Sequence, residues 1–147
     1  MMQELLELRT CIEQQRYADA LILIGEMEEM SRDDKINKIF SYAEILLLHL
    51  IKKPAEQRTT RSWELSFRNS VLAINRVNKR RKAGGYYLTM TELFSTLQEA
   101  YLPALGNASL EAFEGQYDEA QLAEKINKEE LVKQALELIQ LGMDKAK

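Results

Sequence analysis

The spacing of the apolar residues constrains the fold of this chain more than any other feature. No stretch alternates apolar and polar residues as a half-buried strand does, and every long apolar pattern repeats at helical spacing. The 147 residues include 2 prolines and 6 glycines, and no segment has the composition of a linker. We therefore predict an all-α protein, a single-domain bundle of five to seven helices over residues 1–147.

A long helix over about residues 31–52 is predicted to form the centre of the bundle. Its apolar residues cover one broad arc, and in its last two turns the opposite side is apolar as well. Ser31, with Asp34 three positions later, has the pattern of an N-terminal cap, and Pro54 is expected to end the helix. A helix that is apolar nearly all round is covered by other helices of the same chain or by a second copy of it.

Shorter helices are expected on both sides of this central helix. They lie at about residues 5–16, 18–30, 60–83, 91–105 and 128–141, with a further short helix near residue 109. Pro103 is expected to kink or end the helix in which it lies. Gly84 and Gly85 are expected to stop the fourth helix, because glycine accepts the left-handed backbone of a helix C-terminus.

Charge is distributed unevenly along the chain. Residues 52–82 carry a net charge of +8, whereas residues 1–51 carry −5 and residues 83–147 carry −6. The overall net charge of −3 hides this acid–base–acid order. Such an order predicts either a basic surface for an anionic partner or a basic helix neutralised by acidic neighbours.

Seven of the ten basic residues of the 52–82 stretch lie on the fourth expected helix, over residues 60–83. One face, with Trp63 and Ile74, is apolar and should face the core, and the other face is basic. Two leucines interrupt the basic face, which favours packing against another helix over phosphate contact alone. The candidate interaction surface comprises Arg61, Leu65, Arg68, Leu72, Arg76, Lys79, Arg80, Arg81 and Lys82.

Three explanations of this basic helix remain open. The acidic C-terminal helices could cover its leucines and pair with its arginines, within one chain or in a homo-oligomer. An unidentified protein with an acidic surface could bind it. Nucleic acid could bind the cluster Lys79–Lys82, with Tyr86 or Tyr87 stacked on bases, although a pI of 5.4 is lower than a dedicated nucleic-acid binder usually has.

The residue types leave little room for catalysis. With one histidine and one cysteine, a nucleophile–base pair is improbable, and Cys11 has no histidine near it in sequence. No zinc-ligand spacing or glycine-rich phosphate loop is present, so we expect neither a metal nor another cofactor. A helical metal-dependent enzyme with Glu26, Glu29 and His49 at its site is the weakest alternative.

Four short motifs resemble the bacterial family known as domain of unknown function 29, in its cyanobacterial form. They are Arg16-Tyr17, the run from Glu26 to Arg32, the run from Leu46 to Lys52, and Arg61-Ser62-Trp63. The resemblance covers about residues 16–82 and leaves residues 83–147 as an acidic helical extension. It implies a small, all-helical, cytoplasmic bacterial protein, and it brings no known activity or catalytic residues.

The resemblance also implies a local cluster. The chain reverses direction around Pro54, which would bring His49, Arg61 and Trp63 together, with core packing as the simpler explanation.

The function that these patterns favour is a non-enzymatic protein–protein interaction module that acts through its basic fourth helix and forms homo-oligomers. The N-terminus has no signal-peptide pattern, and the most apolar window, residues 45–51, is too short to cross a bilayer. We therefore expect a cytoplasmic protein without a membrane partner.

Overall fold

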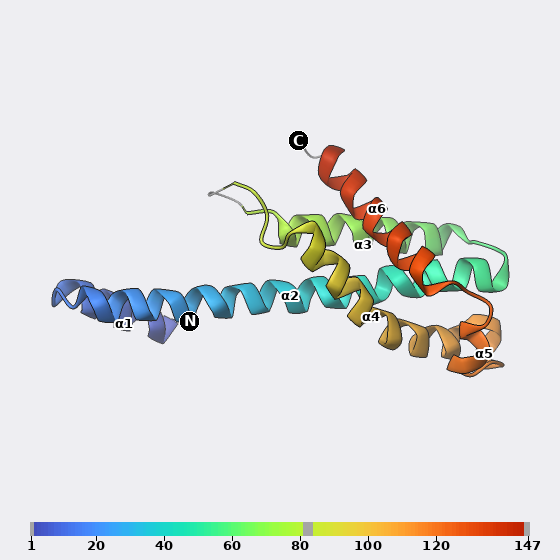
Figure 1. The fold of residues 1–147 in the computed structure, drawn as a ribbon, viewed down its shortest axis with the longest axis horizontal. Coiled ribbons are helices and arrows are strands. Elements are labelled where there is room, and N and C mark those ends of the chain that lie inside the picture. Colours follow the sequence, from blue (N-terminus) through green and yellow to red (C-terminus); the bar gives the residue numbers. More distant parts are fainter. Residues whose placement is uncertain (1, 81–83, 146–147) are drawn as a thin grey trace. The chain divides into compact units, whose positions relative to one another are not determined.

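The computed structural model describes residues 2–80 and 84–145, and these residues form helices and connecting segments without a strand. The helices are α1 (Met2–Glu13), α2 (Tyr17–Glu56), α3 (Arg61–Asn78), α4 (Met90–Glu111), the 3-10 turn η1 (Ala112–Gly115), α5 (Glu119–Ala123) and α6 (Lys128–Lys145) (Figure 1). This order confirms the predicted all-α class. No helix among the described residues is long and apolar enough to cross a membrane.

The chain divides into two compact units, Met1–Lys35 and Ile36–Lys147. The first contains α1 and the start of α2, and the second contains the remainder of α2 with all later helices. The single domain over residues 1–147 stays a prediction.

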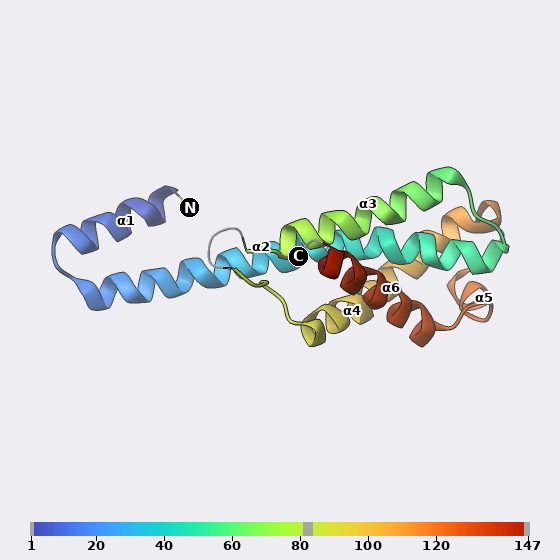
Figure 2. The ribbon, with the colours of Figure 1, turned by 90° about the horizontal axis from the view of Figure 1, so that it is seen from above.

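The first unit is a helical hairpin, in which α1 and the start of α2 run in opposite directions (Figure 2). Gln15 ends α1 with a left-handed backbone, φ 58°. The amide of Gln15 donates to the carbonyl of Ile12, and the amide of Arg16 donates to that of Cys11. These two bonds form a Schellman motif, which satisfies carbonyls that the helix end leaves free and turns the chain back.

α2 runs without interruption from Tyr17 to Glu56, so the predicted helix boundary at Ser31 is wrong. A serine with an acidic residue three positions later resembles a cap, yet it ends no helix by itself. Neither proline nor a left-handed residue lies at this point, so nothing forces the chain out of helical geometry. The 40-residue helix also contains Pro54, two residues before its end.

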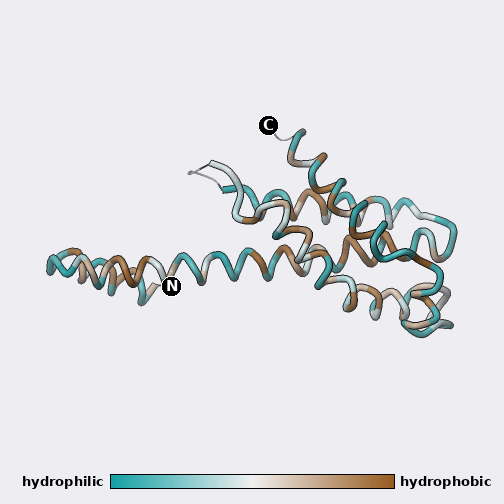
Figure 3. Tube along the Cα trace, in the orientation of Figure 1, coloured by the Kyte–Doolittle hydropathy of each residue, from teal (hydrophilic) through white to brown (hydrophobic). Residues whose placement is uncertain are grey.

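The core of the second unit forms around the part of α2 that follows Ile36. Apolar side chains of this segment pack with those of α3, α4, α5 and α6, and hydrophobic residues concentrate where these helices meet (Figure 3). The buried residues of α2 here are Ile39, Ala43, Leu46, Leu47, Leu50, Ile51, Lys52 and Ala55. The sequence therefore identified the central core segment correctly.

α4 is longer than predicted, because it continues through Pro103 and includes the segment expected to form a separate helix near residue 109. Proline at this position removes an amide that would otherwise bond to the carbonyl of Glu99. Both residues are exposed, so water can satisfy that carbonyl, and the break is not required. α4 packs against α6 and α5, and α6 also packs against α3.

α3 ends at Asn78, several residues before the predicted stop at Gly84. The fully buried Asn78 side chain accepts from the amide of Leu88 at 2.8 Å, and its own amide group donates to the Leu88 carbonyl at 3.4 Å. The chain then reverses, with an isolated antiparallel bridge between Lys79 and Tyr86. Buried hydrogen bonds to a distant segment thus outweigh the helical propensity of the residues that follow.

Candidate interaction surface

α3 begins immediately after the turn that ends α2. Gln57 adopts a left-handed backbone, φ 54°, and the amide of Arg58 donates to the Lys53 carbonyl, which repeats the motif at Gln15. The Thr60 side chain then caps α3 by accepting from the amide of Trp63 at 3.1 Å. In both views α3 lies beside the last part of α2 (Figures 1 and 2).

Trp63 lies between two cations. The Lys52 ammonium is 4.3 Å and the Arg58 guanidinium 4.9 Å from the centre of its ring. Such cation–π contacts stabilise by about 0.5–2 kcal/mol, the larger values applying to desolvated pairs. The predicted partner Arg61 is exposed and makes no ring contact or ion pair with another described residue. The basic partners of Trp63 are therefore Lys52 and Arg58.

Lys52 connects three helices, because it extends from α2 over Trp63 of α3 and pairs with Glu111 at the end of α4. Its ammonium is 3.7 Å from the Glu111 carboxylate, and the residue is 7% exposed. A buried charge is tolerated when it has such partners. On the exposed side, Glu64 binds Lys53 at 3.2 Å and accepts from Thr59 at 2.7 Å. The Thr59 hydroxyl, and then Lys53, lower the pKa of Glu64.

His49 lies one turn before Lys52 on α2. Its Nδ1 atom is buried and has no hydrogen-bond partner among the described residues. Burial lowers the pKa of His49, the charge of Lys52 lowers it further, and Glu111 partly opposes both. The arrangement favours a neutral ring, which suits a packing residue.

The exposed side of α3 carries a regular stripe of basic and apolar residues. We define the Arg–Leu face as the residues that follow one another at spacings of three or four along one side of this helix. They are Arg61, Leu65, Arg68, Leu72 and Arg76. Leu65 is 46% and Leu72 is 59% exposed.

The acidic C-terminal helices do not neutralise this face. α6 packs against the other side of α3, where the Asn75 side chain donates to the Ile139 carbonyl at 3.1 Å. None of Arg61, Arg68 and Arg76 forms an ion pair within the described part of the chain. The described residues therefore show no ion pair that would neutralise these arginines within one chain, and the three explanations of the basic helix stay predictions.

The rest of the predicted surface lies beyond α3. Lys79 and Arg80 are exposed and follow the helix, so they do not occupy its last turn as predicted. Arg81 and Lys82 lie outside the described residues. Tyr86 and Tyr87 are half-buried, and Tyr86 pairs with Lys79 in the bridge.

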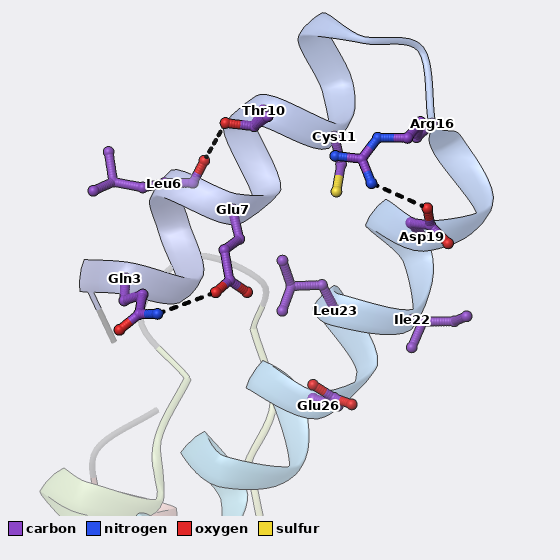
Figure 4. A pocket seen from close by; sticks show the side chains of 10 residues that line it. All are labelled: Gln3, Leu6, Glu7, Thr10, Cys11, Arg16, Asp19, Ile22, Leu23 and Glu26. Atoms are coloured by element: carbon purple, nitrogen blue, oxygen red, sulfur yellow. Dashed lines mark hydrogen bonds and ion pairs between the residues drawn. The ribbon is translucent and has the colours of Figure 1, made fainter.

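A second surface feature lies within the helical hairpin of the first unit. A groove of about 550 Å³ separates α1 from the start of α2 (Figure 4). Glu7 and Leu23 point into it, while Leu6 and Ile22 point away from it at its edges. Within it, Gln3 donates to Glu7 at 3.3 Å, and Arg16 pairs with Asp19 at 3.3 Å.

The described residues contain no group of three or more histidine, cysteine, aspartate or glutamate side chains that could hold a metal ion. Glu26, Glu29 and His49 therefore do not form the cluster that the weakest alternative requires. Cys11 is a buried free thiol in α1.

Comparison with known proteins identifies a family without an assigned activity. The model of the domain of unknown function DUF29 matches residues 7–137. The chain belongs to the DUF29 family. The match continues far beyond residue 82, so most of the acidic C-terminal segment is part of the DUF29 region. No curated protein and no solved structure matches the chain.

Sequence reasoning missed Lys52, Arg58 and Glu111 as neighbours of Trp63. Lys52 directly follows an apolar run and lies nine residues before the first residue of the tryptophan's helix, which was a usable signal. Glu111 could not have been found in this way, because only the packing of α4 brings it to α2.

Proposed function

We propose that this DUF29 chain is a non-enzymatic protein-interaction module whose Arg–Leu face binds an acidic amphipathic helix of a partner protein. One observation carries the proposal: two leucines are exposed between three arginines that have no ion pair with a described residue. A helix that covers half-exposed leucines removes apolar surface from water, which stabilises the complex. Arginines without an ion pair favour a helix that carries acidic residues beside its apolar stripe.

The shape of the face agrees with helix-in-groove recognition rather than with a small-molecule site. Its five residues repeat at spacings of four, three, four and four, as in a helix-packing seam. The cation–π contacts of Trp63 and the Lys52–Glu111 pair hold the first turn of α3 against α2, so the face is part of a fixed helix.

Nucleic acid is the second candidate, and the exposed Lys79 and Arg80 next to the face favour it. Phosphate binding relies on counterion release and therefore falls steeply with salt. It has no need of Leu65 or Leu72, so the two candidates predict different effects of changing them.

A titration can distinguish the two candidates. A fluorescent peptide with glutamate and leucine at helical spacing, and labelled single- and double-stranded DNA and RNA, would be titrated with the chain at about 50 and 200 mM salt. We expect the peptide to bind, and the L65A/L72A variant, which keeps every charge, to weaken it by about tenfold or more. The matched variant L102A/L110A removes two leucines of α4 that are 64% and 76% exposed, and it should have no effect.

The opposite outcome would support nucleic-acid binding in place of binding to an acidic helix. It would consist of salt-sensitive binding of DNA or RNA that L65A/L72A leaves unchanged and R61E/R68E/R76E removes. Failure of the peptide to bind at low salt, at a chain concentration where the chain is monomeric, would contradict the proposed function.

A further inference from the structure

The groove between α1 and the start of α2 resembles the Arg–Leu face in one respect. Both surfaces have apolar side chains along the middle and charged side chains beside them, but the charges have opposite signs. The floor of the groove is apolar at Cys11 and Leu23, and three acids, Glu7, Asp19 and Glu26, line it from both helices (Figure 4). The Arg–Leu face has leucines along its middle and arginines on its flanks. We propose that the groove receives the Arg–Leu face of a second copy of this chain, an inference that rests on the proposed function.

The spacing of charges agrees on the two surfaces. Asp19 and Glu26 are seven residues apart on α2, and Arg61 and Arg68 are seven apart on α3, which in both cases is about 10 Å along a helix. Leu23 lies between the two acids, and Leu65 lies between the two arginines. A helix that lies along the groove can therefore form two ion pairs on either side of one apolar contact.

The volume of the groove limits what can enter it. About 550 Å³ accommodates side chains rather than a whole helix. The exposed leucines of α3 would thus enter the groove towards Leu23 while the helix body rests on its edges. Burial of these apolar groups supplies the attraction, and the charges fix the orientation.

The existing contacts of the acids oppose docking only weakly. Asp19 pairs with Arg16, and both side chains are about half exposed, a type of ion pair that contributes about 0–1 kcal/mol. Glu26 has no ion pair or hydrogen bond with another described residue. An arginine of the second copy therefore competes with at most one weak ion pair.

A second copy is the occupant that the charge order of the chain itself indicates. Residues 1–51 carry −5 and residues 52–82 carry +8, so every copy has both an acidic groove and a basic face. The simplest closed assembly of such copies is a dimer in which the groove of each receives the Arg–Leu face of the other. A partner with only an acidic helix would leave the groove open.

Sedimentation velocity of the full chain at micromolar concentration tests the inference. We expect twice the monomer mass of 17.0 kDa at low salt and weaker association at high salt. The groove variant D19K/E26K and the face variant R61E/R68E should each be monomeric. The matched control E28K/E29K changes two exposed acids outside the groove by the same charge and should remain dimeric.

Mixing the two monomeric variants provides the decisive measurement. In a mixed dimer, one interface is native and the other has both charges reversed, so both are complementary. We expect the mixture to form a dimer with an affinity within about tenfold of the native one, and circular dichroism should show each variant fully helical.

Two outcomes would overturn the inference. A native chain that is monomeric at these concentrations contradicts it, and if the acidic peptide still binds, the proposed function survives alone. A dimer that D19K/E26K leaves intact, or a mixture that stays monomeric, would mean that the copies associate through other surfaces or not at all.

Discussion

Gly142 lies where α6 meets α3, and this position requires the absence of a side chain. A Cβ atom placed there would clash with the Asn75 side-chain nitrogen and come within 3.4 Å of a Val71 methyl group. The same nitrogen donates to the Ile139 carbonyl, so it cannot move away without losing that bond. The close packing of the two helices therefore depends on one hydrogen bond and one glycine.

We expect Gly142→Ala to lower the free energy of unfolding by about 1–3 kcal/mol, measured by urea denaturation, because overpacking outweighs the gain in helix propensity. Gly25→Ala is the matched control, since Gly25 lies within α2 and a Cβ there meets no atom within 4 Å. That variant should be stabilised by up to about 1 kcal/mol. Equal effects at both positions would contradict the packing argument.

The environment of His49 predicts a dependence of stability on pH. Burial, then the charge of Lys52, lower the pKa of His49 below 6.5, so the unfolded chain takes up a proton at a higher pH than the folded one. The stability contributed by the neutral ring is complete above about pH 6.5 and is lost as the pH falls through the folded pKa. Urea midpoints at about pH 7 and 5.5 should therefore differ.

His49→Gln provides the comparison, because it keeps a polar side chain but cannot take up this proton. The decrease in midpoint between the two pH values should be smaller in this variant than in the native chain. An identical decrease in both proteins would assign the pH dependence to other groups.

At the scale of the elements, a Gln-Arg dipeptide lies in the turn after each of α1 and α2. Gln15 and Gln57 adopt positive φ, and the arginine that follows each donates its amide to a carbonyl of the last turn. This conformation destabilises a residue with a Cβ atom by about 1 kcal/mol or more. Glycine is the usual residue here, so the sequence had no obvious sign of either helix end.

We expect Gln57→Gly to raise the free energy of unfolding by about 0.5–1 kcal/mol and to increase the melting temperature, because the left-handed backbone then carries no steric cost. Gln57→Val should have the opposite effect, since a β-branched residue resists positive φ most. A decrease for the glycine variant would mean that the Gln57 side chain itself stabilises the turn.

The end of α3 shows why its length was predicted incorrectly. The propensity of residues 79–82 favours helix, and the two glycines after them resemble a helix stop. The buried hydrogen bonds between Asn78 and Leu88 end the helix earlier. Burial makes these bonds costly to leave unmade, which local propensity of a few tenths of a kcal/mol per residue cannot offset.

At the scale of the molecule, the acid–base–acid charge order has a clear structural counterpart. Three arginines of the basic stretch, Arg61, Arg68 and Arg76, lie on the exposed side of α3 and have no acidic partner within the described residues. α6 covers the opposite side of α3 instead. The proposed function and the proposed dimer both supply acidic charges for these arginines from another molecule or another copy.

The sequence by itself determined the helical class, the buried segment of α2 and the two faces of α3, because apolar spacing reports directly which side of a helix leaves water. It also located the leucines among the arginines. Only the tertiary structure decided that α2 is continuous, that Lys52 and Arg58 rather than Arg61 contact Trp63, and that Leu65 and Leu72 remain exposed. These features depend on which helices meet, and contacts between residues far apart in sequence leave no periodic signal along the chain.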